Sequence, residues 1–295
     1  MTRTLGILSL LAWILGCTGA ADDGLDRHFA CDDGEPDGGG DGDGDGDDDS
    51  PTPGGEGLLF ASGWDSTAAT GCNFEALIDG VWDDYGGSGA CNGSVHDADI
   101  VTDVAHDGAR SLRVTQKPGF INGTDFRIVE MFGPQTDVTL IAWVYYSPNY
   151  RWASADHKIF IAMDPDQTAQ NVYINYRGGS DARHARLCAG ITPVDSVYCA
   201  DSPQVTVDTW YRLRVHIVGG EHGSVDVWLQ PDGEDEVQLD LTHDAGSVVD
   251  IDDVDTGELG GVKYDTTYNA GGSISELMYQ YVDSVEVYQG SIDER

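Results

Sequence analysis

Polar side chains recur at every second position along residues 171–177. In an extended strand successive side chains point to opposite faces, so Asn171, Tyr173, Asn175 and Arg177 share one face. Amide and guanidinium groups hydrogen-bond hydroxyls or carboxylates, and a tyrosine ring offers an apolar surface for stacking. We expect this face to bind polysaccharide, although a solvated exterior sheet face would show the same pattern.

The charge around this face differs from that of the whole chain, whose formal net charge is −37. Residues 127–186 carry equal numbers of basic and acidic side chains, and also contain His157 and His184. The basic residues there are Arg127, Arg151, Lys158, Arg177, Arg183 and Arg186. We therefore expect Arg127, Lys158 and Arg183 to help bind a polysaccharide, including an anionic one. The acidity of the rest excludes a nucleic-acid partner.

The elements that must position these residues are strands. Apolar and β-branched runs separated by Gly, Pro, Asn and Asp recur after residue 57, and no window shows a helical period. The strands are expected at 109–116, 125–132, 138–146, 157–163, 171–177, 210–218, 224–230, 236–241, 260–268 and 278–288. They predict an all-β domain over residues 58–295, folded as a two-sheet antiparallel jelly-roll sandwich.

Two of these strands show how the sheets should be packed. Residues 211, 213, 215 and 217 are apolar and alternate with Arg212, Arg214 and His216, which predicts one buried and one wet face. Residues 138–146 are apolar on both faces, so this strand should lie in the middle of the sandwich.

The N-terminus predicts export. Residues 1–17 combine an early Arg3 with an apolar run, and the ending Ile14-Leu15-Gly16-Cys17 resembles the lipobox of bacterial lipoproteins. The resemblance implies that Cys17 is acylated and that the lipid is the protein's contact with the membrane; a plain signal peptide is the alternative. Thr18 is not the residue of an inner-membrane retention signal, so we expect an outer-membrane lipoprotein.

Residues 18–57 predict a disordered acidic tether. They are rich in Asp and Gly and contain too few apolar residues to form a core. Asp41, Asp43 and Asp45 match the start of a calcium loop, but Thr52 stands where such a loop needs Glu. No cofactor is therefore expected, with calcium as the one metal kept open.

The cysteines fit an oxidising compartment. Cys72 and Cys91 enclose one short loop, and Cys188 and Cys199 enclose another, so two local disulfides are expected. Cys31 is left over in the tether, and no cysteine has the spacing of a zinc site.

Three stretches resemble the concanavalin A-like lectin/glucanase superfamily, including its polysaccharide-lyase branches. They are WDSTAATGCNFEALIDGVWDD at 64–84, VYYSPNYRWASADHKIFIAMDPDQTAQNVYINYR at 144–177, and GELGGVKYDTTYNAGGSISELMYQYVDSVEVYQG at 257–290. The resemblance implies a jelly roll whose concave sheet carries the ligand. Because this superfamily contains binding modules, hydrolases and lyases, fold does not fix activity.

Hydrolysis is disfavoured because the E-x-D-x-x-E pattern of such glucanases is missing. A lyase needs a group that neutralises the uronate, a base and an acid. Asn175 and Arg177 could neutralise, and His157 or His184 could be the base. Tyr268 in KYDTTYN resembles the catalytic tyrosine of an alginate-lyase strand, with a spacing from Lys263 one residue longer.

Three functions remain open from the sequence. A surface lipoprotein that binds polysaccharide through the concave sheet is the main hypothesis. A lyase that cleaves a uronate glycan by β-elimination is the second. A non-catalytic structural or adhesive surface module is the third.

Overall fold

The computed structural model describes most of the chain after residue 56. The described ranges are 57–65, 82–86, 96–119, 122–123, 126–152, 156–167, 169–178, 182–193, 195–243, 251, 255–266, 268–269 and 274–292. Of these, residues 84–86, 96, 122–123, 156, 243 and 268–269 are described by their backbone alone. The expected signal peptide and tether, residues 1–17 and 18–57, lie outside these ranges except for Gly57.

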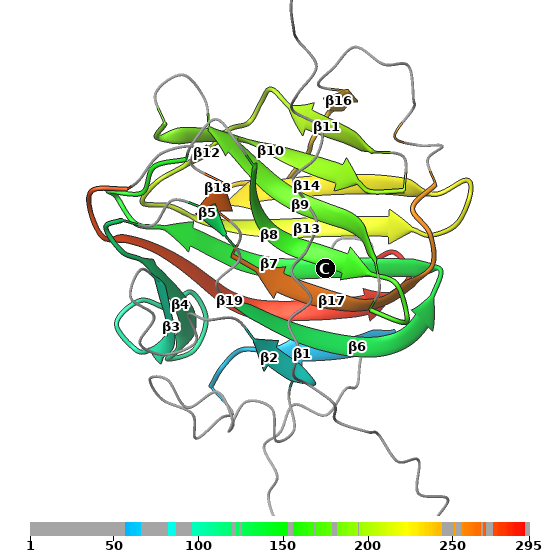
Figure 1. The fold of residues 1–295 in the computed structure, drawn as a ribbon, viewed down its shortest axis with the longest axis horizontal. Helices are drawn as coiled ribbons and strands as arrows, with labels where there is room; N and C mark the ends of the chain where they lie inside the picture. Colours follow the sequence, from blue (N-terminus) through cyan, green and yellow to red (C-terminus); the bar gives the residue numbers. More distant parts are fainter. Residues whose placement is uncertain are drawn as a thin grey trace, which may run out of the picture. The chain divides into compact units, whose positions relative to one another are not determined.

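The described elements are strands, which form two antiparallel sheets, one in front of the other in Figure 1. Sheet A contains β1 (Leu58–Ser62), β3 (His96–Val101), β4 (Ser111–Gln116), β7 (Asp137–Tyr146), β13 (Trp210–Val218), β14 (Ser224–Pro231), β15 (Val237–Gln238) and β19 (Met278–Gln289). Its order is β15-β14-β13-β7-β19-β4-β3, with β1 beside β19.

Sheet B is the front layer of Figure 1. It contains β2 (Asp84–Gly86), β5 (Asn122–Gly123), β6 (Arg127–Gln135), β8 (Asp156–Met163), β9 (Gln170–Gly178), β10 (His184–Ile191), β11 (Ser196–Ala200), β12 (Val205–Thr206), β16 (Leu241–His243), β17 (Leu259–Asp265) and β18 (Tyr268–Asn269). Its order is β16-β11-β10-β9-β8-β17-β6-β2, and the short strands β12, β18 and β5 pair at its borders.

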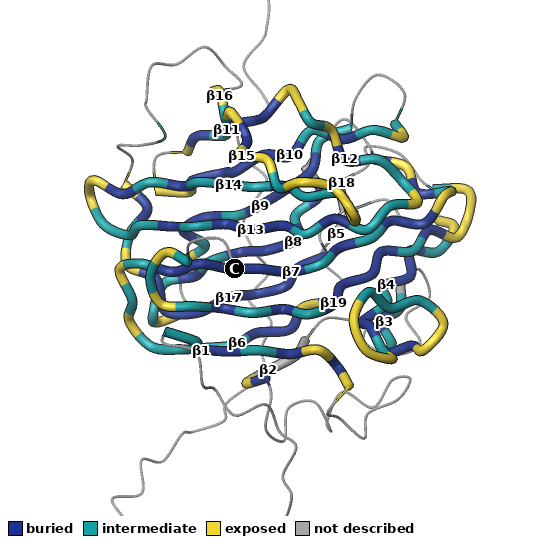
Figure 2. The backbone as a smooth tube through the Cα atoms, turned by 180° about the vertical axis from the view of Figure 1, so that it is seen from behind, coloured by how far each residue is buried: buried dark blue, intermediate teal, exposed yellow. Residues whose placement is uncertain are grey.

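One apolar core fills the space between the sheets. Val144 of β7 and Leu213 of β13 meet Phe160 of β8 and Ile174 of β9 in the same cluster of buried side chains. Figure 2 shows the buried backbone as dark stretches along the middle strands, with exposed turns at their ends. Each large apolar side chain that is fully buried contributes about 1.5–3 kcal/mol, so this core is the main source of stability.

One face of β9 packs into the core, so its other face lies on the outside of sheet B. Ile174 and Tyr176 point into the core, where the ring of Tyr176 lies 5.3 Å from that of Tyr146. Alternation then directs Tyr173, Asn175 and Arg177 to the outer face of sheet B. The face predicted from the sequence for Tyr173, Asn175 and Arg177 is therefore confirmed.

Residues 138–146 are confirmed as a central strand, because β7 lies between β13 and β19. The face of β13 that was expected to be exposed to solvent departs from this expectation at Arg214, which is only 7% exposed. Its guanidinium stacks 3.8 Å from the ring centroid of Trp228, and it pairs with Glu236 and with the carbonyl of Ile292. The segment before β15 and the last described residues cover this part of the face.

The strand expected at 260–268 is interrupted. β17 ends at Asp265, and β18 begins at Tyr268 after Thr266 has bonded to the carbonyl of Phe126. β17 continues the pairing of β6 and β8, whereas β18 pairs with β5 and with the start of β8. Because of this break, Tyr268 and Asn269 pair with β5 and with the start of β8, and not with β6.

Candidate functional site

The candidate site is the outer face of sheet B around β9. Pairing places Tyr173 between Ile161 of β8 and Gly190 of β10. Asn175 lies between Lys158 of β8 and Cys188 of β10. Directly opposed residues share a face, so these two rows form one surface.

Tyr173 lies flat over its neighbours. A Cβ built on Gly190 would be 2.0 Å from Cζ of Tyr173, so the ring occupies the space that a side chain there would need. On its other side Lys158 places Nζ 4.5 Å from the ring centroid and donates a 2.8 Å hydrogen bond to Gln170 Oε1. The ring is held between a glycine and a cation, so its outer side becomes open for stacking when Lys158 moves away from it.

Asn175 is the most unusual side chain of this surface. It is fully buried, and neither Nδ2 nor Oδ1 has a hydrogen-bond partner. A buried polar group without a partner costs about 1–3 kcal/mol, and such groups are rare in native proteins. The amide is therefore available to a ligand group that reaches it.

Asn171 has a different environment on the same strand, at the point where the register between β9 and β8 shifts. It is 4% exposed, and its Nδ2 donates a 2.7 Å hydrogen bond to the carbonyl of Glu258. A Cβ built on Gly257 would be 2.8 Å from the same nitrogen. Asn171, expected as a binding residue, thus connects β9 to the segment before β17.

Lys263 belongs to this surface although the sequence analysis gave it no role. It lies between Val129 of β6 and Ile161 of β8 in the row that continues to Tyr173. Its ammonium is 3.0 Å from Asp265 Oδ2, and both side chains are nearly buried. Only its place in the KYD segment, two residues before an aspartate on a strand, could have pointed to it.

An apolar patch lies beside these polar groups. Val129, Ile161 and Met163 are buried, and Met131 and Tyr173 pack against them in a cluster separate from the main core. The outer face of sheet B therefore has an apolar half on β6 and β8 and a polar half on β9 and β10. A ligand pocket typically combines these two features.

The other basic residues lie around this centre. Arg177 is half-buried and is paired in register with Arg186, which contacts Asp201 at 3.3 Å. Arg127 is exposed at the start of β6, opposite Asp265. Asn175 thus has Lys158 opposite it on β8 and Arg177 two residues further along β9.

Two predicted residues lie further along β10 and its preceding turn. Arg183 is exposed and donates a 3.0 Å hydrogen bond to the carbonyl of Pro148. His184 is half-buried at the beginning of β10 and pairs in register with Thr206. Neither residue lies directly opposite Asn175 in the pairing of the strands.

His157 and Tyr268 are brought together by the backbone. They are directly opposed in the pairing of β8 with β18, one position from Lys158. His157 is 4% exposed and is also opposed to Tyr176, whose side chain lies in the core. The side chain of Tyr268 is outside the described atoms.

Glu130 of β6 is a carboxyl group with a strongly raised pKa. Burial, and after it the charge of Asp83, raises the pKa of Glu130 to about 8, although a backbone hydrogen bond near Asp83 opposes this. Asp83 also accepts a 2.7 Å hydrogen bond from the N–H of Met131. Glu130 lies opposite Val262 of β17, so it belongs to the inner side of the sheet edge.

The disulfide between Cys188 and Cys199 is present, as expected, and links β10 to β11 beside Asn175. Cys17, Cys31, Cys72 and Cys91 lie outside the described residues. Within the described part of the chain, no group of three or more His, Cys, Asp or Glu side chains is arranged to hold a metal ion. No helix there has the length and hydropathy of a membrane span.

No known family model and no curated protein sequence matches this chain. Solved structures do match its fold. A PL-14 alginate lyase from Aplysia kurodai has a TM-score of 0.53 at 11% identity, covering 79% of this chain and 99% of that one. An endo-β-1,4-glucuronan lyase from the fungus Trichoderma reesei has a TM-score of 0.50 at 14% identity, covering 72% and 92%.

The alginate lyase Aly36B, solved as a double mutant with an alginate trisaccharide, has a TM-score of 0.50 at 13% identity and covers 80% of this chain and 99% of that one. Identities this low establish the fold alone. The described part of the chain therefore shares the two-sheet antiparallel jelly-roll fold with these lyases.

Proposed function

We propose that the outer face of sheet B binds an anionic, uronate-containing polysaccharide. The observation that carries this proposal is the buried amide of Asn175, which has no hydrogen-bond partner and lies in register with Lys158. A ligand carboxylate accepts from the amide nitrogen, and a ligand hydroxyl donates to its oxygen. Binding would then satisfy both atoms.

The neighbouring side chains fit this ligand class. Lys158 and Arg177 flank the amide and supply positive charge for carboxylates. The ring of Tyr173, held over Gly190, offers a stacking surface for a sugar ring. Similar folds in alginate and glucuronan lyases are consistent with this ligand class.

The amide has to become accessible when the ligand binds. Asn175 is closed to solvent, and the movable groups beside it include the long side chain of Lys158. Lys158 would exchange its hydrogen bond to Gln170 for one to the ligand, so the cost of moving it is small. The proposal thus includes a rotation of Lys158 on binding.

The direct test uses the purified chain without residues 1–17 and a panel of polysaccharides with and without uronates. Affinity electrophoresis should show retardation by alginate and polyglucuronate, and salt should weaken it. Equal mobility with and without every uronate polymer would refute the proposal. Absorbance of an unsaturated product, measured on the same samples, separates an enzyme from a binding protein.

A lyase is the second candidate because the KYDTTYN segment resembles an alginate-lyase strand and lies next to the start of β8. Asn175 is opposed to Lys158 on the outer face, whereas the adjacent His157 is opposed to Tyr268 and to Tyr176 of the core, so His157 is not placed to act on a ligand at the outer face. In β-elimination a base takes the C5 proton, a C4=C5 double bond forms, and the C4–O4 bond breaks as the leaving oxygen gains a proton. Asn175 and Arg177 would neutralise the uronate, and proton transfer would fall to Tyr268. Tyr268→Phe should then abolish product formation and leave binding intact.

The location of the protein is proposed from residues 1–17 alone. Acylation of Cys17 would attach the chain to the outer membrane, with residues 18–57 as the spacer. Wild-type protein should fractionate with membranes, and Cys17→Ser should release it. A wild-type protein already found in the soluble fraction would contradict the anchor.

A further inference from the structure

Sheet A carries an aromatic surface on its outer face, on the other side of the sandwich from Asn175. Trp210 of β13 is opposed to Tyr145 of β7, and Tyr145 is opposed to Tyr281 of β19. The ring centroids are 5.4 Å apart for Trp210 and Tyr145 and 5.6 Å apart for Tyr145 and Tyr281. Tyr279 follows at 6.4 Å from Tyr281. These four residues are called the aromatic row.

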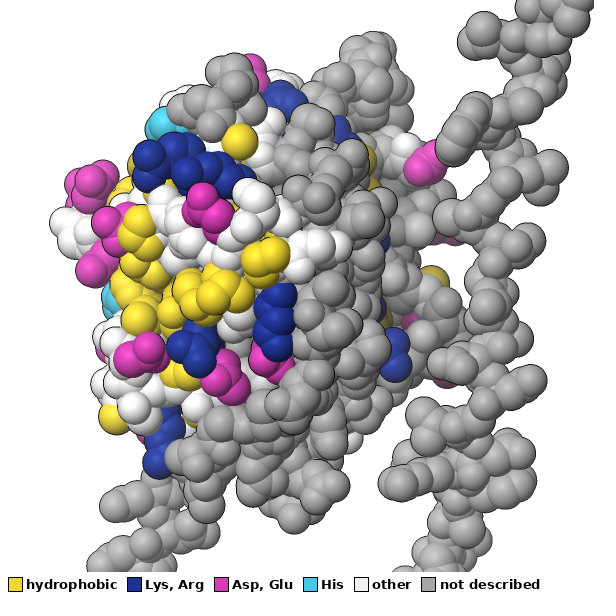
Figure 3. All heavy atoms as spheres, turned by 60° about the vertical axis from the view of Figure 1, so that its left-hand side comes forward, with side chains coloured by type: hydrophobic (Ala, Val, Ile, Leu, Met, Phe, Trp, Pro, Cys, Tyr) yellow, Lys and Arg dark blue, Asp and Glu magenta, His cyan; other side chains and the backbone are white. Residues whose placement is uncertain are grey.

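The aromatic row is accessible. Trp210, Tyr145 and Tyr279 are partly exposed, whereas Tyr281 is 5% exposed and supports the rings on either side of it. The beginnings of β13 and β19 and the end of β7 lie on the left of Figure 1, and Figure 3 shows hydrophobic side chains gathered on that side among charged ones. An apolar patch bordered by polar groups commonly marks a binding surface.

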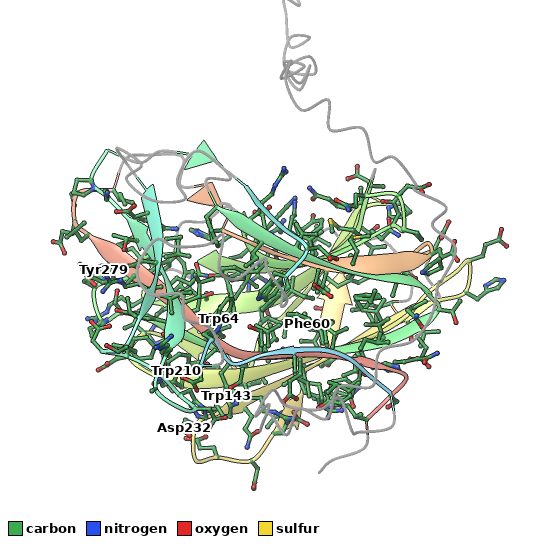
Figure 4. The ribbon with its side chains drawn as sticks, turned by 90° about the horizontal axis from the view of Figure 1, so that it is seen from below. Phe60, Trp64, Trp143, Trp210, Asp232 and Tyr279 are labelled. Carbon is green, nitrogen blue, oxygen red and sulfur yellow. A yellow bond between two sulfur atoms is a disulfide. The ribbon has the colours of Figure 1, made fainter. Side chains whose placement is uncertain are left out.

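Each end of the row contacts a further side chain: His106 at the Trp210 end and Arg113 at the Tyr279 end. His106 lies 3.5 Å from Trp143 in a stacked arrangement and 5.6 Å from Trp210 edge-on, and the N–H of His106 donates to the buried carboxylate of Asp283. Figure 4 shows Trp143, Trp210 and Asp232 close together, with Tyr279 further along.

At the other end the Arg113 guanidinium is 5.6 Å from the ring centroid of Tyr279. The rings are therefore held in place before any ligand binds, which lowers the entropic cost of binding.

The charges around the row disfavour an anionic ligand. Arg113 is paired with Asp99 at 2.8 Å, and Arg212 is paired with Glu236 at 3.1 Å. Asp208 and Asp232 are exposed beside the row. These carboxylates accept hydrogen bonds from hydroxyls and repel carboxylates.

The hydroxyl of Tyr145 is hydrogen-bonded to one of these carboxylates, that of Asp208. It donates a 2.8 Å hydrogen bond to Asp208 Oδ1. Burial, and then Asp208, raise the pKa of Tyr145 above its usual range, so the hydroxyl stays protonated. This hydrogen bond fixes the orientation of the partly exposed Tyr145 ring.

We propose that the aromatic row is a second glycan-binding site, which takes a neutral polysaccharide chain by stacking sugar rings on Trp210, Tyr145 and Tyr279. The acidic border supplies acceptors for sugar hydroxyls. This site differs in location and in ligand charge from the one around Asn175, and it does not depend on the function proposed for that face.

The test is affinity electrophoresis of the chain lacking residues 1–17 in gels that contain hydroxyethyl cellulose, xylan or galactomannan, with alginate as the anionic comparison. Wild type should be retarded by at least one neutral polymer. Trp210→Ala and Tyr279→Ala should each weaken that affinity by about tenfold and leave the alginate affinity unchanged. Trp228→Ala is the matched control, because its ring is already covered by Arg214.

Four results would overturn the proposal. The first is no retardation of wild type by any neutral polymer. The second is unchanged retardation in both Trp210→Ala and Tyr279→Ala, each checked for its native melting temperature. The third is an equal loss in Arg177→Ala, which would place the neutral glycan on sheet B. The fourth is wild-type self-association that Trp210→Ala abolishes without any glycan binding, which would make the row a contact between copies of the chain.

Discussion

The ring of Tyr173 occupies the space above Gly190, on the strand next to its own. A Cβ on Gly190 would lie 2.0 Å from Cζ of Tyr173 and 2.4 Å from its hydroxyl oxygen. Since real Cβ atoms do not approach other heavy atoms so closely, the absence of a side chain at position 190 sets the orientation of the ring. The stacking surface of the candidate site therefore depends on a glycine two strands away from Lys158.

Gly190→Ala should displace Tyr173 and lower stability by about 1–3 kcal/mol, because an extra methyl group must be accommodated in a packed surface. Urea unfolding measures the loss. The same variant should weaken alginate binding. In a double-mutant cycle, Gly190→Ala should cost much less in a Tyr173→Ala background. Additive costs would show that the two residues do not interact.

Arg177→Ala should weaken the binding of an acidic glycan by about 1.5–3 kcal/mol, because a charge-assisted hydrogen bond to a carboxylate is lost. Stability should change little. Isothermal titration with alginate oligomers measures the affinity. Arg212→Ala on sheet A is the matched control, and an equal effect of both variants would indicate general charge rather than a contact.

Cys188→Ser combined with Cys199→Ser should lower the free energy of unfolding by about 2–3 kcal/mol, since the disulfide closes a loop with a sequence separation of 11. A non-reduced digest should contain the linked peptide. Recovery of both residues as free thiols would contradict the pairing. The expected link between Cys72 and Cys91 can be sought in the same digest.

Glu130 should make the protein less stable as the pH rises. Its pKa is about 8 in the folded chain and ordinary in the unfolded chain, so the folded state binds more protons between these values. The contribution of Glu130 to stability is therefore greatest below about pH 4.5 and falls toward pH 8 by about 1–2 kcal/mol, a figure that allows for solvent screening of a partly exposed carboxyl.

Urea unfolding across this pH range measures the slope for wild type and for Glu130→Gln. The variant should be more stable than wild type at pH 8 and should show a flatter profile. Identical profiles would mean that the carboxyl of Glu130 is solvated.

Much of the fold could be predicted from residue patterns. Alternation in β9 and β13 and the apolar run of β7 identified strands and faces correctly, because burial on one side leaves a clear period of two. The strands β10 and β11 were missed. Their sequences, with Ala189, Gly190 and Cys199, are buried on both faces, one of which is covered by Tyr173 and the disulfide, so they lack the polar alternation of a half-exposed strand.

The candidate site could be predicted only in part. Period-two spacing placed Tyr173, Asn175 and Arg177 on one face, but it could not distinguish Asn175 from Asn171. That difference depends on the carbonyl of Glu258, which lies 87 residues away in sequence. Lys263 was missed for the same reason, since its place beside Ile161 follows from the pairing of β17 with β8.

The central claim is that the amide of Asn175 is kept without a protein partner because it binds a ligand. Asn175→Leu removes the amide at similar size, so it should raise the free energy of unfolding by about 1 kcal/mol, because an unsatisfied buried group costs stability. Asn171→Leu is the control on the same strand, and it should destabilise because its amide donates to the carbonyl of Glu258.

The measurement that decides is the alginate affinity of Asn175→Leu, taken together with its urea unfolding curve. We expect a variant that is as stable as wild type or more stable, and that binds alginate at least tenfold more weakly. A variant that binds alginate as wild type does, or that loses stability as Asn171→Leu does, would contradict it.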